Sequence, residues 1–187
     1  LSLYSDEINE AKYNAKISPK QNILNIKDIA LNFVQNFDNP DEKNLLFTGN
    51  TGLGKTFLSN CIAKEVLSLG KTVLYQSAPI MLDNIVDYRF GKSDFVELYN
   101  RIIDVDLLII DDLGAEATNS VKTAELNNII NDRLHYTNGP VRKTIISTNL
   151  NMNNLLNTYN ERIFSRLAAY YSICRFFGND IRLSKVI

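Results

Sequence analysis

The segment "GNTGLGKT", residues 49–56, carries the residues whose types and spacing most clearly predict chemistry. It fits the pattern G-x-x-x-x-G-K-[ST] through Gly49, Gly54, Lys55 and Thr56, after an apolar run and before apolar residues at helical spacing. Glycines let the backbone turn tightly, so that successive N–H groups and the start of the following helix can surround a phosphate chain. We therefore predict a nucleotide site in which Lys55 reaches the β- and γ-phosphates and the Thr56 hydroxyl ligates Mg²⁺. The predicted ATP-binding residues are Gly49, Asn50, Thr51, Gly52, Leu53, Gly54, Lys55, Thr56 and Phe57. The alternative is a glycine-rich turn with a surface lysine.

Two adjacent carboxylates follow a second apolar run, in "LLIIDD". Open α/β sheets bind ligands at the carboxyl ends of their strands, which is where Asp111 and Asp112 are expected. Asp111 is predicted to hold Mg²⁺ together with Thr56, and Asp112 to orient and deprotonate an attacking water. The second acid favours ATP hydrolysis over storage, because it is not needed to hold the metal. An acidic turn after a strand is the alternative.

Two further polar signals follow in chain order. Asn149 ends the run "KTIIST", where its amide could hydrogen-bond the γ-phosphate or the attacking water, although an Asn at a strand end is usually a turn residue or a helix cap. Arg162 and Arg166 in "ERIFSRL" are four residues apart and share a helix face. A cation is needed to neutralise the charge that develops on a transferring phosphoryl group, whereas most exposed arginines are simply solvated.

These residues must be positioned by alternating strands and helices. Apolar runs predict five strands at 44–48, 72–76, 106–111, 143–148 and 172–177, and amphipathic segments predict helices near 55–69, 79–90, 93–102, 121–136 and 159–170. The first four runs are almost continuously apolar, which is typical of strands that helices cover on both faces. The sequence therefore predicts an α/β domain with a mostly parallel sheet.

The N-terminal part has a different pattern. We predict an extension over 1–40 that contains an amphipathic helix at about 25–37, with Asn25 as its N-cap, and a core over 41–187. The 187 residues, 45% of them hydrophobic, suffice for one domain of ordinary size. A net charge of −1 gives no global basic field, so any contact with nucleic acid must come from a local patch.

Cysteine usage and hydropathy bear on the compartment. The two cysteines lie far apart without metal-binding spacing, so we expect free, buried thiols in a reducing cytosol. There is no apolar run long enough to span a membrane and no signal peptide, and we therefore expect a cytoplasmic protein without a membrane partner.

Taken together, "GNTGLGKT", "LLIIDDLG", "TIISTN", "ERIFSRL" and "GNDIRLSK" resemble the AAA+ ATPases of the DnaC/DnaI helicase-loader branch and their IstB-type relatives, from about Asn44 to Lys185. The resemblance implies a three-layer P-loop NTPase with a five-stranded parallel sheet in the order 5-1-4-3-2 and a reduced or absent C-terminal lid. It also implies a Mg²⁺-dependent ATPase of low basal rate. By the same resemblance Asn149 is the sensor-1 residue, Arg166 the arginine finger that acts on ATP in a neighbouring subunit, and Arg182 the sensor-2 arginine.

The resemblance also implies partners. It predicts a replicative hexameric DNA helicase as client, a homo-oligomer joined through the arginine finger when ATP is bound, and single-stranded DNA. The candidates for DNA contact are Tyr88, Arg89, Phe90 and Lys92, which could stack on bases and bind phosphates; alternatively they are the end of an ordinary helix. A transposition ATPase with a transposase as client is the second hypothesis. A small-molecule kinase and a nucleotide-gated binding module are the third and fourth.

Overall fold

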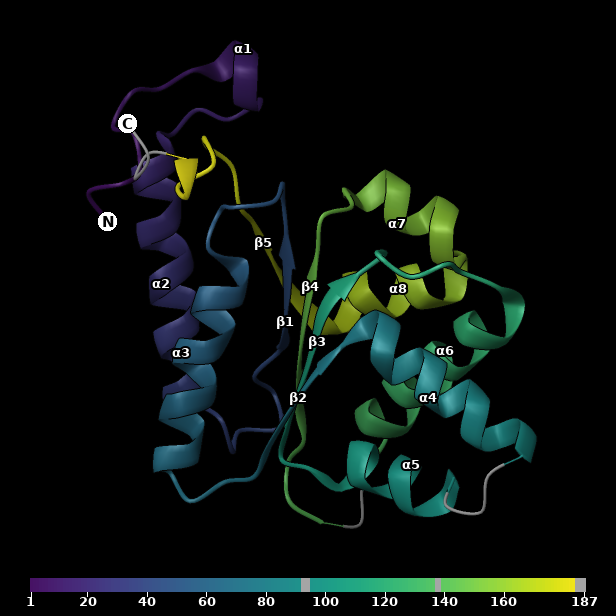
Figure 1. Ribbon diagram of the computed structural model, residues 1–187. Helices are drawn as coiled ribbons and strands as arrows, with labels where there is room; N and C mark the ends of the chain where they lie inside the picture. Colours follow the sequence, from purple (N-terminus) through teal and green to yellow (C-terminus); the bar gives the residue numbers. More distant parts are fainter. Residues whose placement is uncertain (92–94, 137–138, 184–187) are drawn as a thin grey trace.

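A single parallel sheet forms the centre of the protein. The computed structural model describes residues 1–91, 95–136 and 139–183. Its strands are β1 (Asn44–Thr48), β2 (Val73–Ser77), β3 (Leu107–Leu113), β4 (Lys143–Thr148) and β5 (Tyr171–Arg175), in the order β2-β3-β4-β1-β5 (Figure 1). Every neighbouring pair is parallel. Read from the other edge this is 5-1-4-3-2, so the predicted order is confirmed.

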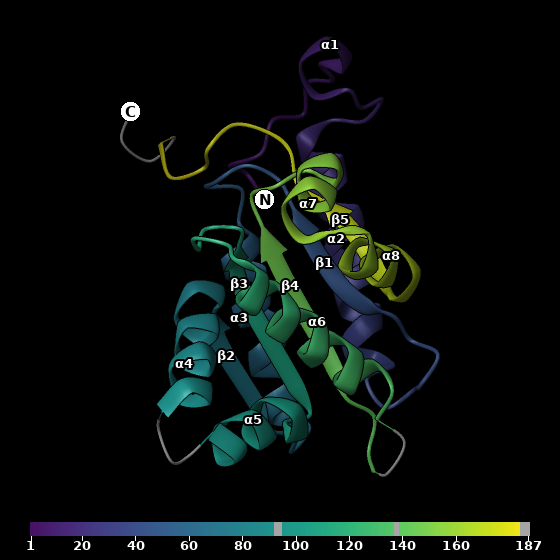
Figure 2. The same ribbon diagram turned by 90° about the vertical axis from the view of Figure 1, so that its right-hand side faces the viewer.

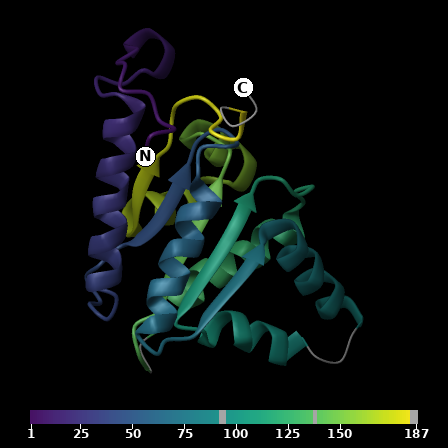
Figure 3. The ribbon, with the colours of Figure 1, turned by 60° about the vertical axis from the view of Figure 1, so that its left-hand side comes forward.

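Helices cover both faces and make three layers. The helices α2 (Pro19–Gln35) and α3 (Lys55–Ser68) lie together on one face, in front of the sheet in Figure 3. The other side, turned toward the viewer in Figure 2, carries α4 (Ala78–Gly91), α5 (Phe95–Asp104), α6 (Ser120–Leu134), α7 (Met152–Tyr159) and α8 (Glu161–Tyr170). A one-turn helix, α1 (Glu10–Tyr13), precedes them in the chain. Each face therefore has its own apolar core against the shared sheet.

The depth of each strand follows from its place in the sheet. All residues of β1 and β4 are buried, and β3 is buried except at Asp112. The edge strand β2 is only half-buried throughout its length. The prediction of strands covered on both faces therefore holds for the central three, and β2 departs from it because it lies at the edge of the sheet that the described residues form.

The start of α2 corrects the predicted N-cap. The helix begins at Pro19, and the Ser18 hydroxyl accepts a hydrogen bond from the Gln21 N–H at 3.1 Å. Serine is a favoured cap, and proline suits the first helical position because an N–H there would lack a partner. Asn25 lies inside the helix, where its Oδ1 accepts from Gln21 Nε2 at 2.9 Å, so Asn25 as the N-cap was wrong.

Two other expectations also need correction. The helix predicted at 159–170 is α8, but a separate helix, α7, precedes it and was not predicted; Asn160 divides the two, since it has a φ of 86° and caps α8 by accepting from the N–H groups of Arg162 and Ile163. Cys174 is buried, which raises its thiol pKa to about 12, but Cys61 is exposed, contrary to the expectation that both are buried.

Among the described residues, we find no helix with the length and apolar character that crossing a membrane requires.

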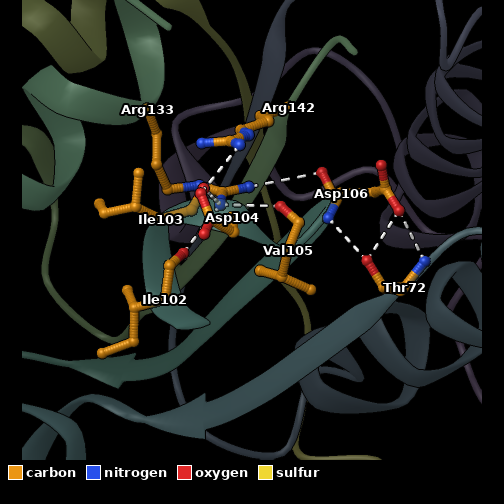
Figure 4. Close-up of polar contacts among 8 residues, drawn as sticks. All are labelled: Thr72, Ile102, Ile103, Asp104, Val105, Asp106, Arg133 and Arg142. Atoms are coloured by element: carbon orange, nitrogen blue, oxygen red, sulfur yellow. Dashed lines mark hydrogen bonds and ion pairs between the residues drawn. The ribbon is translucent and has the colours of Figure 1, made fainter. Parts of the chain in front are cut away.

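At the amino ends of the strands, a buried arginine connects helices and strands through hydrogen bonds. The Arg133 side chain of α6 is 4% exposed, and it donates to the Thr144 hydroxyl and to backbone carbonyls at the end of α5 and at the starts of β3 and β4. Figure 4 shows its contacts between the end of α5 and the start of β3. These carbonyls belong to Ile102 (2.8 Å), Ile103 (3.0 Å), Val105 (2.9 Å), Asp106 (3.4 Å) and Lys143 (2.7 Å). Helix ends leave carbonyls without helical partners, and Arg133 supplies donors for them.

Candidate functional site

The residues of the glycine-rich segment form a loop at the carboxyl ends of the strands, beside a cavity of about 280 Å³. The cavity is bordered by this loop, by the ends of β3 and β4 and by the C-terminal segment, with lining residues Thr51, Gly52, Leu53, Gly54, Lys55, Thr56, Phe57, Asp112, Asn149, Ile181 and Arg182. Four segments that are far apart in the sequence thus meet where the motifs predicted a site. Ile181 is the one lining residue that the sequence did not predict.

The loop has a conformation that its glycines permit. Gly49 has a φ of 137°, and a Cβ there would collide with the carbonyl oxygen of Phe176. Gly54 has a φ of 90° and precedes the first residue of α3 without any side-chain cap bond. The first N–H groups of α3 therefore face the cavity edge with no capping side chain to accept from them, as an anion site requires.

Lys55 and Asn149 meet at the back of the cavity. The Lys55 ammonium is largely buried and donates to the Gly49 and Asn50 carbonyls at 2.6 and 2.8 Å, and to Asn149 Oδ1 at 2.9 Å. Burial lowers the Lys55 pKa, while the charges of Asp112 and Asp111 act in the opposite direction. The cation and the amide, predicted from separate motifs, are thus in direct contact.

Asp111 faces the hydroxyl of Thr56. Thr56 Oγ1 donates to Asp111 Oδ2 at 3.1 Å, and the carboxylate is 7% exposed. It also accepts hydrogen bonds from the hydroxyls of Tyr75 and Ser147. Hydroxyl and carboxylate oxygens are the ligands that Mg²⁺ prefers, and such sites are usually completed by substrate phosphates, so this pair fits the predicted ion.

Asp112 is turned out of the sheet by an irregularity in β3. The pairing register of β3 with β4 shifts between Ile110 and Leu113, and Asp112 has a φ of 56°. Its N–H donates to Ser147 Oγ at 3.1 Å, and it is the exposed residue of an otherwise buried strand. Positive φ is uncommon outside glycine and concentrates at functional sites, and here it directs a carboxylate to the cavity.

The comparison with known families decides the relationship. The IstB-like ATP binding protein family matches residues 5–168. The chain belongs to this family.

Three similar proteins describe the relationships of the IstB-like chain in more detail. It is 28% identical over 164 residues to the replicative helicase loader DnaC of Escherichia coli K12, covering 87% of this chain and 65% of the relative's length. It is 31% identical over 107 residues to a protein of insertion sequence IS1162 from Pseudomonas fluorescens described as ATP-binding, covering 57% and 44%. A crystal structure of the DnaC helicase loader matches with a TM-score of 0.72 at 23% identity, covering 90% of this chain and 96% of that one.

Together these matches make the chain an AAA+ ATP-binding protein related to DnaC helicase loaders and to insertion-sequence IstB proteins.

The two predicted arginines of the IstB-like chain lie in different places. Arg182 lines the cavity and pairs with Asp180 at 2.9 Å, a contact that raises the Arg182 pKa. The same segment is fixed to the loop by the Ile181 N–H, which donates to the Gly52 carbonyl at 2.9 Å. Arg166 is not among the cavity-lining residues, and its guanidinium donates to Asn131 Oδ1 of α6 at 2.9 Å.

The candidates for DNA contact in the IstB-like chain lie at the end of α4. Tyr88 is half-buried, and Arg89 forms an ion pair with Glu125 of α6. The side chain of Phe90 and the whole of Lys92 lie outside the described residues. These positions therefore stay predictions.

Tyr75 and Ser147 were missed by the sequence reasoning. Ser147 lies on the strand next to β3, and Tyr75 lies on β2, where it pairs with Ile109 two residues before Asp111. The register of adjacent parallel strands could have indicated both, but it depends on the strand order and not on any local motif.

Proposed function

We propose that this protein hydrolyses ATP to ADP and phosphate at the cavity beside the glycine-rich loop. The observation that carries the proposal is the meeting of Lys55, Asp112 and Asn149 around one cavity, which the glycine-rich loop, the N-terminal end of α3 and the C-terminal segment also border. Loop N–H groups and Lys55 would bind the triphosphate, and Asn149 would orient the γ-phosphate or the water. Mg²⁺, held by Thr56 and Asp111, would neutralise charge on the phosphate oxygens.

Asp112 is the proposed base. It would take a proton from the attacking water as the water oxygen bonds to the γ-phosphorus and the bond from that phosphorus to the bridging oxygen breaks, so that ADP leaves. Its exposure to the cavity and its backbone conformation support this role. A small-molecule kinase would instead transfer the phosphoryl group to an acceptor and would release no free phosphate in its absence.

Arg166 is proposed to act on ATP in a neighbouring subunit. It does not line the cavity of its own subunit, and α8 presents it beside Asn131. A cation supplied from outside would be missing in an isolated subunit, so we expect a low basal rate and an ATP-dependent homo-oligomer. To act on a neighbour's ATP, Arg166 must give up its contact with Asn131 and bind phosphate instead.

The proposed client is a replicative DNA helicase, loaded onto single-stranded DNA in the cytoplasm. The proposal rests on the DnaC relatives, of which this chain spans 65% of the length. A transposase is the second candidate, supported by the 31% identity to the IS1162 protein. Both clients would use the same ATP cycle.

Phosphate release tests the proposed ATPase and its assembly together. The full chain is mixed with ATP, Mg²⁺, single-stranded DNA and a hexameric helicase, and Arg166→Ala is compared with Arg162→Ala. Arg162 is the matched control, because it lies one turn away on α8 and is exposed. Arg166→Ala is expected to bind ATP normally but to lose stimulated release by about 10³-fold, while Arg162→Ala keeps it. Stimulated turnover by Arg166→Ala at the wild-type rate would refute action on a neighbour.

Affinity capture separates the two clients. The protein with a non-hydrolysable ATP analogue is used as bait in its own cell extract. Retention of the replicative helicase supports the loader proposal, and retention of a transposase without helicase supports the alternative.

A further inference from the structure

The carboxylate of Asp111 is surrounded by hydroxyl groups from three different elements. Thr56 approaches from α3, Tyr75 from β2 and Ser147 from β4, and all three donate to Asp111. Both carboxylate oxygens are engaged, because Ser147 reaches Oδ1 and Tyr75 reaches Oδ2. The AAA+ motifs account for Thr56, but no motif in the chain accounts for the other two.

Ser147 also connects the two adjacent acids. Its hydroxyl is fully buried, donates to Asp111 Oδ1 and accepts from the Asp112 N–H at 3.1 Å. One hydroxyl thus links the carboxylate predicted to hold Mg²⁺ with the backbone that directs the predicted base to the cavity. The link spans the register shift in β3, where ladder bonding to β4 is interrupted.

Tyr75 is available as a permanent donor. A phenol carries its proton at neutral pH, so the Tyr75 hydroxyl can act as the donor to Asp111 Oδ2. It stands on the half-buried edge strand, and the phenol spans the distance from β2 to the end of β3. The core needs no phenol at this position, since a phenylalanine ring would fill the same space.

We propose that Tyr75 and Ser147 are positioning residues that fix the Asp111 carboxylate and thereby set the affinity of the site for Mg²⁺ in the nucleotide complex. The inference rests on the proposed use of Mg²⁺-ATP at this cavity. A carboxylate held by two further donors has one orientation, whereas a free carboxylate samples several and loses some of them on binding a metal. Groups that support a metal ligand in this way typically contribute about 10- to 100-fold in metal affinity or activity.

The test compares nucleotide affinity with and without the metal. A fluorescent, non-hydrolysable ATP analogue is titrated into the full chain in Mg²⁺ and in EDTA, so that the readout does not depend on turnover. Tyr75→Phe is expected to reduce the enhancement of affinity by Mg²⁺ roughly tenfold and to leave the EDTA affinity unchanged. Ser147→Ala is expected to reduce the enhancement by Mg²⁺ as well, and thermal unfolding checks that each variant is folded.

Tyr99→Phe is the matched control. The Tyr99 hydroxyl likewise donates to a carboxylate, Asp132, at 2.8 Å, but it does so between α5 and α6, and neither residue lines the cavity. It is expected to leave the Mg²⁺ enhancement intact.

Each failure has a distinct reading. A wild-type protein whose nucleotide affinity does not respond to Mg²⁺ contradicts the proposed function itself. Wild-type enhancement in both Tyr75→Phe and Ser147→Ala overturns the positioning role alone. An equal loss of affinity in Mg²⁺ and EDTA, or the same loss in Tyr99→Phe, also overturns it, because the hydroxyls would then act only on the fold.

Discussion

The two ends of the sheet both contain charged side chains, but these side chains have different partners. At the amino ends, Arg133 donates to five carbonyls and a hydroxyl, and the Lys143 ammonium donates to the carbonyls of Asn39 and Glu42. At the carboxyl ends, Lys55 and Asp112 border a cavity of about 280 Å³. Charges that the chain itself surrounds with partners hold elements together, whereas charges beside a cavity can exchange their partners for a ligand. This difference predicts that substitutions at one end weaken folding and those at the other weaken binding and catalysis.

The largest expected effect is at the carboxyl end. Asp112→Asn removes the proposed base, and we expect phosphate release to fall by about 10³-fold, because general-base catalysis contributes on that order. Asparagine tolerates the positive φ of 56°, so the free energy of unfolding should change by no more than about 0.5 kcal/mol. Phosphate-release kinetics and chemical denaturation measure the two quantities. If Asp112→Asn unfolds at a lower denaturant concentration than the wild type but releases phosphate at the wild-type rate, the proposed difference between the two ends of the sheet is contradicted.

The amino end should respond in the opposite way. Arg133→Met leaves several buried carbonyls without donors, and we expect the free energy of unfolding to fall by about 3 kcal/mol, or the melting temperature by roughly 10 °C. Burial lowers the Arg133 pKa to about 9, so the group that is lost is a cation at neutral pH. Below the melting temperature, ATP affinity should be unchanged.

Arg101→Met is the control for this substitution. Arg101 forms an exposed ion pair with Glu97 on α5, and exposed pairs contribute about 0–1 kcal/mol. Equal destabilisation by the two substitutions would mean that the carbonyl contacts of Arg133 do not matter for stability.

The two ends of the sheet also differ in how much the sequence could predict. The motif residues at the carboxyl ends were predicted because tight loops and buried strands impose local patterns, whereas the strand order was predicted only through the family resemblance. The start of α2 was missed although Ser18-Pro19 is a strong local signal, and α7 was missed because its boundary depends on the positive φ of Asn160. Tyr75, Ser147 and Arg133 could not be predicted, since their roles depend on which elements lie side by side.

The smallest expected effect is the pH dependence of ATP affinity. Burial lowers the Lys55 pKa, and a bound triphosphate would raise it, so ATP affinity should fall as pH rises from the free-state Lys55 pKa toward the ordinary lysine value. The fall is at most about tenfold per pH unit, because one proton is involved. The stability of the fold should change in the opposite direction. The buried cation destabilises the folded state fully below its lowered pKa, and this destabilisation is lost as pH rises.

Lys143 sharpens this prediction. Its pKa is also lowered by burial, but it lies at the amino ends of the strands, so its titration should change stability without changing ATP affinity. Calorimetric titration of ATP at several alkaline pH values, with the wild type and Lys143→Met, measures this. Loss of the pH dependence in Lys143→Met would contradict the assignment to Lys55.

Calorimetric titration of ATP and Mg²⁺ into the wild type and Lys55→Ala tests most directly whether the loop at 49–56 binds a triphosphate. Lys71→Ala is the control, because Lys71 pairs with Asp38 at 2.6 Å and does not line the cavity. We expect one ATP per chain for the wild type and Lys71→Ala, and no measurable binding for Lys55→Ala. Equal affinity in all three proteins would show that the triphosphate does not bind at this loop.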